Sequence, residues 1–140
     1  MKIKIKKLNE DSKIPTYSHE FDAGMDLYAH EETEVFPFEV VKIKTGISMH
    51  IPDGFVGLIW DKSGLACRNS IKVVAGVVDA TYRGEILVGL TNIGKDKYVF
   101  KKGDKVAQML IQKVEQAEFD EVSNLEETGR GSGGFGSTGV

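Results

Sequence analysis

Residues 76–85 read Gly76-Val77-Val78-Asp79-Ala80-Thr81-Tyr82-Arg83-Gly84-Glu85. They close an apolar run, Val73 to Val78, whose β-branched side chains are typical of a buried strand. A second strand is predicted directly afterwards, with Ile86, Val88 and Leu90 on one face. The sequence therefore predicts a β-hairpin whose corner carries a carboxylate, an aromatic ring and a guanidinium. Taken alone, this corner is also explained by an Asp that forms the turn and a Tyr that packs over the hairpin.

Short strands separated by turns are predicted on both sides of this hairpin. Alternating or continuous apolar residues predict strands at residues 2–8, 41–51, 55–60, 98–100 and 106–114. No segment keeps a helical period for three turns, and the best helical candidate, residues 65–72, is short. Many short strands of this kind predict an all-β fold, either a sandwich, a jelly roll or a barrel.

Composition limits the classes of function. The chain has 140 residues, enough for one domain, and its net charge of -3 gives no reason to expect duplex nucleic acid as a partner. The single Cys67 has no disulfide partner, and the three histidines form no ligand pattern. The sequence shows neither a signal-peptide pattern nor an apolar run long enough for a membrane span. We therefore expect a soluble, intracellular, cytoplasmic protein without a membrane partner.

The last fifteen residues differ in composition from the rest. We expect a β-rich domain over residues 1–125 and a flexible, glycine-rich tail over residues 126–140. Glycine amides in the tail, together with Arg130 and the hydroxyl residues around it, could wrap a polyphosphate, and Phe135 could stack on a base. The alternative is a disordered tail that has no role.

Two further polar features need partners. Gln108 interrupts an apolar strand, so its side chain is expected to find a hydrogen-bond partner or a ligand. Asp22 and Asp26 lie in a segment that is too short and too interrupted by glycine for a helix. We expect this segment to be a turn that enters a strand, with the two carboxylates as a hydrogen-bonded turn pair.

Five stretches, in this order and spacing, resemble the trimeric dUTPase family over about residues 20 to 139. They are Asp22-Ala23-Gly24-Met25-Asp26-Leu27, Lys62-Ser63-Gly64-Leu65-Ala66, Gly76 to Glu85, Gly103-Asp104-Lys105-Val106-Ala107-Gln108-Met109, and Arg130 to Gly139. The resemblance implies a jelly-roll-like fold and a homotrimer with active sites shared between subunits. It also implies a dUTP diphosphatase that uses Mg²⁺ to convert dUTP to dUMP and pyrophosphate, which limits uracil incorporation into DNA and supplies the precursor of dTMP.

The resemblance also implies roles for particular residues. Asp79 would orient and activate the attacking water, Tyr82 would pack under the deoxyribose, and the backbone near Gly76 and Val78 would bind uracil. The implied phosphate ligands are Lys62, Ser63, Gly64, Gln108, Arg130, Gly136, Ser137 and Thr138. Phe135 would cover the uracil, and Asp26 would lie near the metal through water.

These roles agree with the chemistry of hydrolysis between the α and β phosphates, which needs a water in line, a base, and cations that stabilise the departing charge. The Tyr82 ring, flat against C2′ of the deoxyribose, would leave no room for the 2′-hydroxyl of a ribose. The sequence departs from the family pattern at Asp61-Lys62, where Pro-Arg is usual. Lys62 keeps the charge but lacks the bidentate fork of Arg, and Asp61 adds a negative charge unless a cation such as Lys62 or Arg83 pairs with it.

Two alternatives remain open at this stage. The first is a dCTP deaminase or a bifunctional relative on the same fold, which would need a glutamate as proton shuttle, with Glu85 as the candidate close after the hairpin. The second is a non-catalytic nucleotide-binding or regulatory protein, because a fold alone does not establish activity.

Overall fold

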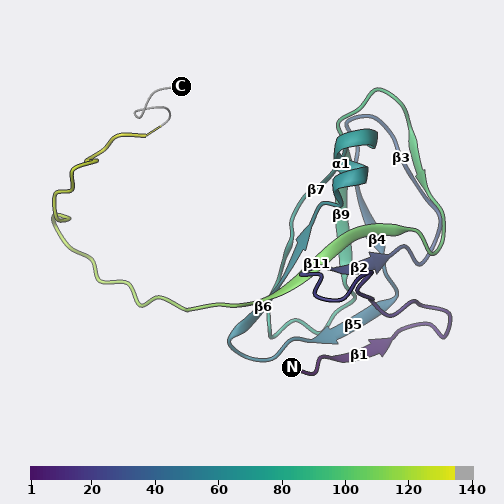
Figure 1. Ribbon diagram of the computed structural model, residues 1–140, viewed down its shortest axis with the longest axis horizontal. Helices are drawn as coiled ribbons and strands as arrows, with labels where there is room; N and C mark the ends of the chain where they lie inside the picture. Colours follow the sequence, from purple (N-terminus) through teal and green to yellow (C-terminus); the bar gives the residue numbers. More distant parts are fainter. Residues whose placement is uncertain (135–140) are drawn as a thin grey trace.

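The computed structural model describes residues 1–134 as two packed β-sheets, two short strand pairs and one helix (Figure 1). The larger sheet has the strand order β2-β11-β6-β8 and the smaller one β4-β9-β7; β1 pairs with β5, and β3 with β10. The elements are β1 (Lys4–Lys7), β2 (Met25–Tyr28), β3 (Thr33–Val35), β4 (Val40–Lys44), β5 (Ile47–His50), β6 (Phe55–Trp60), α1 (Ser63–Asn69), β7 (Ile71–Val73), β8 (Val77–Val78), β9 (Leu87–Asn92), β10 (Tyr98–Phe100) and β11 (Lys105–Lys113). The predicted all-β, jelly-roll-like class is confirmed.

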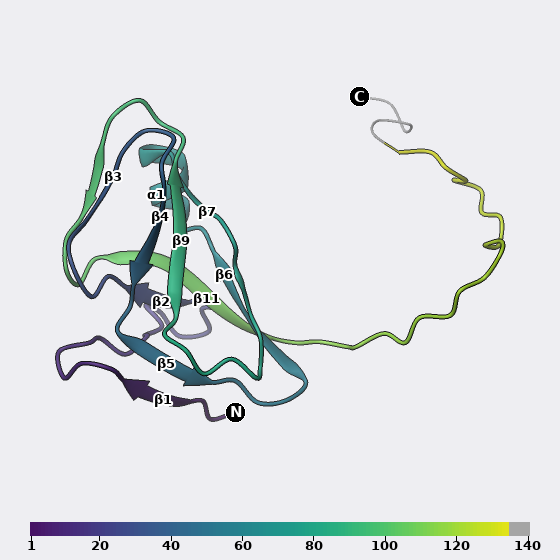
Figure 2. The same ribbon diagram turned by 180° about the vertical axis from the view of Figure 1, so that it is seen from behind.

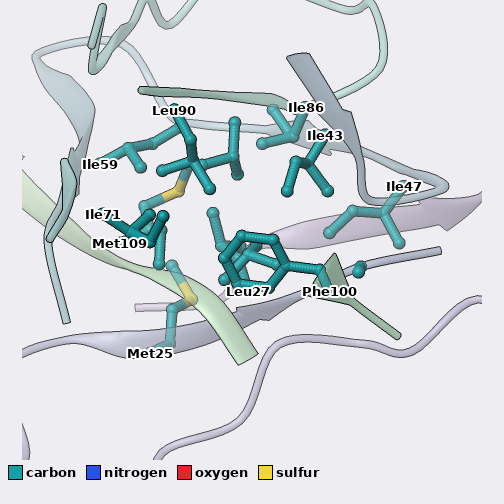
Figure 3. Packing of buried hydrophobic residues seen from close by; sticks show 14 of the residues in the cluster. Met25, Leu27, Ile43, Ile47, Ile59, Ile71, Ile86, Leu90, Phe100 and Met109 are labelled. Carbon is teal, nitrogen blue, oxygen red and sulfur yellow. The ribbon is translucent and has the colours of Figure 1, made fainter. Parts of the chain in front are cut away.

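The hydrophobic core lies between the two sheets (Figure 3). Leu27 of β2 and Met109 of β11 meet Ile43 of β4 and Leu90 of β9, and Phe100 of β10 packs among them. All five side chains are completely buried. Burying a side chain of this size stabilises the folded state by about 1.5–3 kcal/mol, so this layer joins the sheets and fixes the position of the loops above them.

The strand predicted for Val41–Ile51 is two strands in different sheets. β4 ends at Lys44, Gly46 adopts a φ of +68°, and β5 pairs with β1 instead of continuing beside β9. The alternation continues through the bend, because Thr45 and Ile47 are both buried. The Thr45 hydroxyl donates to the backbone oxygen of Ile86 at 2.6 Å, which satisfies a polar group inside the core.

The single strand predicted for Val73–Val78 is also divided. β7 pairs with β9, but Ala75 adopts a φ of +59° and the chain crosses to the other sheet, where Val78 pairs with Gly57 of β6. Val77 is consequently 69% exposed instead of buried. The two strands of the predicted hairpin are therefore β7 and β9, which do pair. The chain between them forms β8, which is an edge strand of the larger sheet. A run of apolar residues without alternation carries no signal for such a crossing.

The remaining predictions agree closely with the structure. The strands predicted at residues 55–60 and 98–100 match β6 and β10, and the short helix predicted near residues 65–72 is α1. Ile86, Val88 and Leu90 are buried together as predicted. Beyond Lys113 the chain leaves the sheets as an extended segment, which lies away from the body of the molecule in both views (Figures 1 and 2). The division between residues 125 and 126 stays a prediction.

Candidate functional site

An open cavity, named here the phosphate-sized cavity, lies beside the start of α1, where β6 leads into the helix. Its volume is about 590 Å³, and it is lined by Lys62, Ser63, Gly64, Leu65, Arg68, Asn69, Lys105 and Gln108. The structure therefore brings together four of the residues expected to bind phosphate, although Gln108 lies far from the other three in the sequence. Three of the lining side chains are cationic, so the cavity is suited to an anion.

A buried carboxylate holds two of these cations. Asp26 on β2 is 3% exposed, and it accepts from Lys105 at 2.6 Å, from the Ser18 hydroxyl at 2.7 Å and from Lys62. Burial opposes ionisation of this carboxyl, but the hydrogen bonds from Lys105, Lys62 and Ser18 outweigh burial and lower the pKa of Asp26 from 3.8 to about 2. Asp26 is therefore an anion at neutral pH that anchors β11 and the start of α1 to β2.

The predicted turn pair of Asp22 and Asp26 is wrong. Asp22 accepts a hydrogen bond from the backbone N–H of His19 at 2.9 Å and so closes an exposed turn. Asp26 instead lies within β2, with the partners given above. The predicted turn that enters a strand is confirmed. The two carboxylates have different partners, since Asp22 closes the turn and Asp26 pairs with Lys62 and Lys105.

Asp61 faces away from the phosphate-sized cavity. Its carboxylate accepts from the backbone N–H of Val73 at 2.6 Å and pairs with Lys72, so its partner is neither Lys62 nor Arg83. The backbone oxygen of Asp61 accepts a hydrogen bond of 2.8 Å from the Gln108 side chain. Asp61 thus connects the segment before α1 with β7 and β11. The hydrogen-bond partner predicted for Gln108 is the backbone oxygen of Asp61.

Asp79 and Tyr82 lie at a second cavity of about 170 Å³. The backbone N–H of Tyr82 donates to the backbone oxygen of Asp79 at 3.1 Å, and the Tyr82 hydroxyl donates to the backbone oxygen of Glu85 at 2.9 Å. The ring lies over Gly84, because a Cβ on that residue would come within 2.3 Å of the Tyr82 hydroxyl oxygen. Asp79 is exposed, and its carboxylate bonds to no residue of the described chain. It is therefore free to bind water.

The backbone expected to bind uracil lies beside this cavity. The Gly76 oxygen accepts from Ile59 at 2.7 Å, and Val78 pairs with β6. Because β8 is the last strand of its sheet, the N–H and C=O groups on its other edge pair with no strand among residues 1–134. Gly76 is required at its position, since a Cβ there would come within 2.4 Å of the Ile59 backbone oxygen.

Within a single chain, the residues expected to bind substrate do not all lie in one cavity. The Asp79 cavity and the phosphate-sized cavity have no lining residue in common. Arg130 lies on the extended segment after β11, where its Nε donates to the Gly133 backbone oxygen at 2.8 Å. Phe135, Gly136, Ser137 and Thr138 lie outside the described residues.

Two residues that line the phosphate-sized cavity, Lys105 and Arg68, were not predicted from the sequence. Lys105 lies on β11, three residues before Gln108. Arg68 follows Gly64 by four residues, and this spacing places Gly64 and Arg68 on one face of α1. This helical spacing was the available signal for Arg68. Residues 1–134 contain no cluster of three or more His, Cys, Asp or Glu side chains that could hold a metal ion. No helix within these residues is long and apolar enough to cross a membrane.

The cationic cavity at the start of α1 is suited to the phosphate groups of a small molecule, so the site defines a protein that binds a phosphorylated compound. Comparison with known proteins narrows this class. The dUTPase family model matches residues 10–139, and this chain belongs to the dUTPase family.

Particular relatives support the assignment. The chain is 48% identical to the deoxyuridine 5′-triphosphate nucleotidohydrolase of Rickettsia bellii (strain OSU 85-389), with 99% of this chain and 95% of the relative covered. A mutant dUTPase of Staphylococcus bacteriophage 80alpha, solved with dUpNHpp, superposes with a TM-score of 0.93 at 27% identity and covers 99% of both chains. A mutant dUTPase of S. aureus phage phi11, described for the coordination of a structural Mg(II) ion, has a TM-score of 0.84 at 25% identity, with 91% of this chain and 100% of that chain covered.

Proposed function

We propose that this protein hydrolyses dUTP to dUMP and pyrophosphate. The observation that carries the proposal is the 48% identity, over nearly the whole chain, to a protein named for this reaction. The reaction would limit uracil incorporation into DNA and supply the precursor of dTMP. Because the substrate is a free nucleotide, we also propose a cytoplasmic location.

The phosphate-sized cavity would hold the triphosphate. Lys62, Ser63, Gly64 and Gln108 line it and offer a cation, a hydroxyl, and side-chain and backbone amides. Phosphate oxygens accept such donors, and charge-assisted hydrogen bonds are about twice as strong as neutral ones. The buried Asp26 would keep Lys62 and Lys105 beside the cavity before substrate arrives, so that little reorganisation is needed on binding.

Asp79 would position the attacking water and accept its proton. A carboxylate is a weak base at neutral pH, so orientation of the water would contribute more than basicity. The Tyr82 ring, fixed by its hydrogen bond to the Glu85 oxygen, would pack under the deoxyribose and exclude a ribose hydroxyl. The open edge of β8 would pair with uracil through backbone groups near Gly76 and Val78, which leaves cytosine with unmatched donors.

The described residues fit Mg²⁺ that arrives with the substrate. Mg²⁺ binds oxygen ligands, keeps several waters, and is usually held by substrate phosphates together with one or two carboxylates. Residues 1–134 contain no cluster of three or more His, Cys, Asp or Glu side chains that could hold the ion without the substrate. Asp26, through water, is the carboxylate that we propose beside the phosphates. The metal would neutralise charge on the triphosphate and on the departing pyrophosphate.

We further propose a homotrimer in which each site is completed by neighbouring chains. The separation of the Asp79 cavity from the phosphate-sized cavity supports this assembly, as does the extended segment after Lys113. In the proposal, the tail of residues 126–140 closes over the nucleotide. Arg130, Gly136, Ser137 and Thr138 bind phosphate, and Phe135 covers the uracil.

The alternative of dCTP deamination is not favoured. A deaminase of this kind needs a glutamate that is free to transfer protons. Glu85, the candidate, accepts a hydrogen bond of 2.8 Å from the backbone N–H of Gly46. This bond joins the end of the Asp79 loop to the bend between β4 and β5, so Glu85 has a structural task.

The proposal is tested by measuring pyrophosphate release from dUTP, UTP, dCTP and dTTP with Mg²⁺. We expect release from dUTP far above the other three. No release from dUTP, or equal release from all four nucleotides, would contradict the proposal. Formation of deoxyuridine nucleotides from dCTP would favour the deaminase, and tight binding of dUTP without turnover would favour a regulatory protein.

A further inference from the structure

We propose that Arg68 is a substrate-binding residue that holds the pyrophosphate portion of the triphosphate. The proposal rests on the proposed hydrolysis of dUTP and adds a residue to its site. It follows from the distribution of charge around the phosphate-sized cavity.

Two of the three cations that line this cavity already have a counter-ion. Lys62 and Lys105 both pair with the carboxylate of Asp26, which is 3% exposed. A phosphate that draws either ammonium away would leave a buried carboxylate with less compensation, which is costly. The two lysines therefore provide charge near the phosphates, but their ammonium groups are restricted to the wall of the cavity.

Arg68 is the lining cation without such a restriction. Its side chain is exposed and makes no hydrogen bond or ion pair with any residue between 1 and 134. The guanidinium lies back over Gly64, with Nη2 3.5 Å from the place where a Cβ on Gly64 would stand. It is thus beside Gly64 on the wall of the cavity, and it can turn toward an anion without breaking a hydrogen bond or ion pair with a described residue.

The chemistry of Arg fits this position. A guanidinium presents a planar fork that binds two phosphate oxygens at once, whereas the Lys62 ammonium is a point charge. In the proposed shared site, the α phosphate lies toward Asp79 of a neighbouring chain, because the water that Asp79 positions attacks it. The β and γ phosphates then extend into the larger cavity, where Arg68 stands. The ordinary alternative is that Arg68, in the last turn of α1, only stabilises the helix through its dipole.

The test compares Arg68→Gln and Arg68→Lys with the wild type. Both replacements retain good helix propensity, and Arg68→Lys keeps the charge without the fork. The matched control is Lys95→Gln, which removes another exposed cation, from the loop after β9. Affinities for dUpNHpp and for dUMP are measured by calorimetry, KM and kcat for dUTP by pyrophosphate release, and folding by thermal melting.

We expect Arg68→Gln to weaken dUpNHpp binding on the order of 10- to 100-fold, the range for loss of hydrogen bonds to a charged group. Binding of dUMP should change less than about twofold, because dUMP lacks the β and γ phosphates. Arg68→Lys should fall between the wild type and Arg68→Gln, and Lys95→Gln should match the wild type.

Two results overturn the role of Arg68 while leaving dUTP hydrolysis intact. One is an active wild type whose Arg68→Gln variant binds dUpNHpp equally well, with or without a lower melting temperature. The other is equal weakening of dUpNHpp and dUMP. A wild type that neither binds dUpNHpp nor hydrolyses dUTP overturns both proposals.

Discussion

Gln108 on β11 donates a hydrogen bond from Nε2 to the backbone oxygen of Asp61, 2.8 Å away, at the point where β6 leads into α1. The bond gives a polar side chain on an apolar strand a defined partner. It also fixes Gln108 beside Lys62 and Ser63 on the wall of the phosphate-sized cavity. The position of the Gln108 side chain in the wall of the cavity therefore depends on this bond.

Replacing Gly24 by alanine should displace that amide. A Cβ at Gly24 would come within 2.4 Å of Gln108 Oε1 and 3.1 Å of Gln108 Cβ, so the side chain must turn and release the Asp61 oxygen. We expect activity to fall at least about tenfold, as for loss of a hydrogen bond to a charged phosphate. Pyrophosphate release and thermal melting measure the effect.

The control is Gly54→Ala, which places a methyl group in open space at a φ of +77°. This substitution should cost about 1 kcal/mol of stability through backbone strain but leave activity intact. Full activity in Gly24→Ala would show that the position of Gln108 does not matter.

Asp79→Asn should abolish turnover without disturbing the fold. The Asp79 side chain is exposed and bonds to no described residue, so the melting temperature should remain within a degree or two. Loss of a positioned base usually lowers the rate on the order of 10²–10⁴-fold. Calorimetry should show that the variant still binds dUpNHpp. Near-normal turnover in this variant would assign the base to another residue.

Sequence patterns predicted the parts of this fold that depend on local periodicity. The alternation around Ile43 and Ile47 identified buried positions correctly, because one face of each strand meets the core. It did not reveal that the chain changes sheet at Gly46, since alternation continues through the bend. The positive φ at Ala75 likewise has no local signal, because alanine rarely adopts it.

The ion-pair cluster around Asp26 could not be predicted for a different reason. Lys62 and Lys105 reach Asp26 only because β2 and β6 both pair with β11. Nothing in the sequence near any one of these residues specifies that pairing. Gln108 is an intermediate case, since its polarity within an apolar strand predicted a partner but not the identity of that partner.

Asp26 should make stability depend on pH below 4. Its pKa is about 2 in the folded protein and near 3.8 when unfolded, so its contribution is complete above about pH 4 and is lost as pH falls toward 2. That contribution is about 2 kcal/mol. Asp26→Asn should lower the free energy of unfolding at pH 7 and reduce its decline between pH 4 and 2.

Denaturant unfolding at pH 7 and pH 3, at one protein concentration, measures this effect. Asp22→Asn serves as the control because Asp22 lies in an exposed turn, and it should retain the steep decline. An equally steep decline in Asp26→Asn would assign the acid sensitivity to other groups.

The segment around Arg130 should be cut by trypsin in the free protein and protected by nucleotide. Arg130 is exposed on the extended segment, with hydrogen bonds only to neighbouring residues among those described. If the tail closes over the substrate, dUpNHpp should slow cleavage after Arg130, followed by mass spectrometry. The same rate with and without dUpNHpp would contradict a closing tail.

The assembly prediction uses two variants that each lack one part of the proposed site. Asp79→Asn keeps its tail, and the second variant keeps Asp79 but ends after Glu127. Each alone should be nearly inactive. In the described chain, the Asp79 cavity and the phosphate-sized cavity are separate. Arg130 lies on the segment that follows the last strand, β11. Parts from different chains can therefore complement one another in a mixed trimer.

When the two variants are unfolded and refolded together in equal amounts, random symmetric assembly gives mixed trimers. If Asp79 and the tail of one site come from different chains, roughly a quarter of the sites receive both intact parts. Pyrophosphate release should then return to about a quarter of the wild-type rate, whereas mixing without unfolding should restore little. If each tail folds back onto its own chain, no site receives both parts. Mixed trimers that are verified by native mass spectrometry and remain inactive would rule out the shared site.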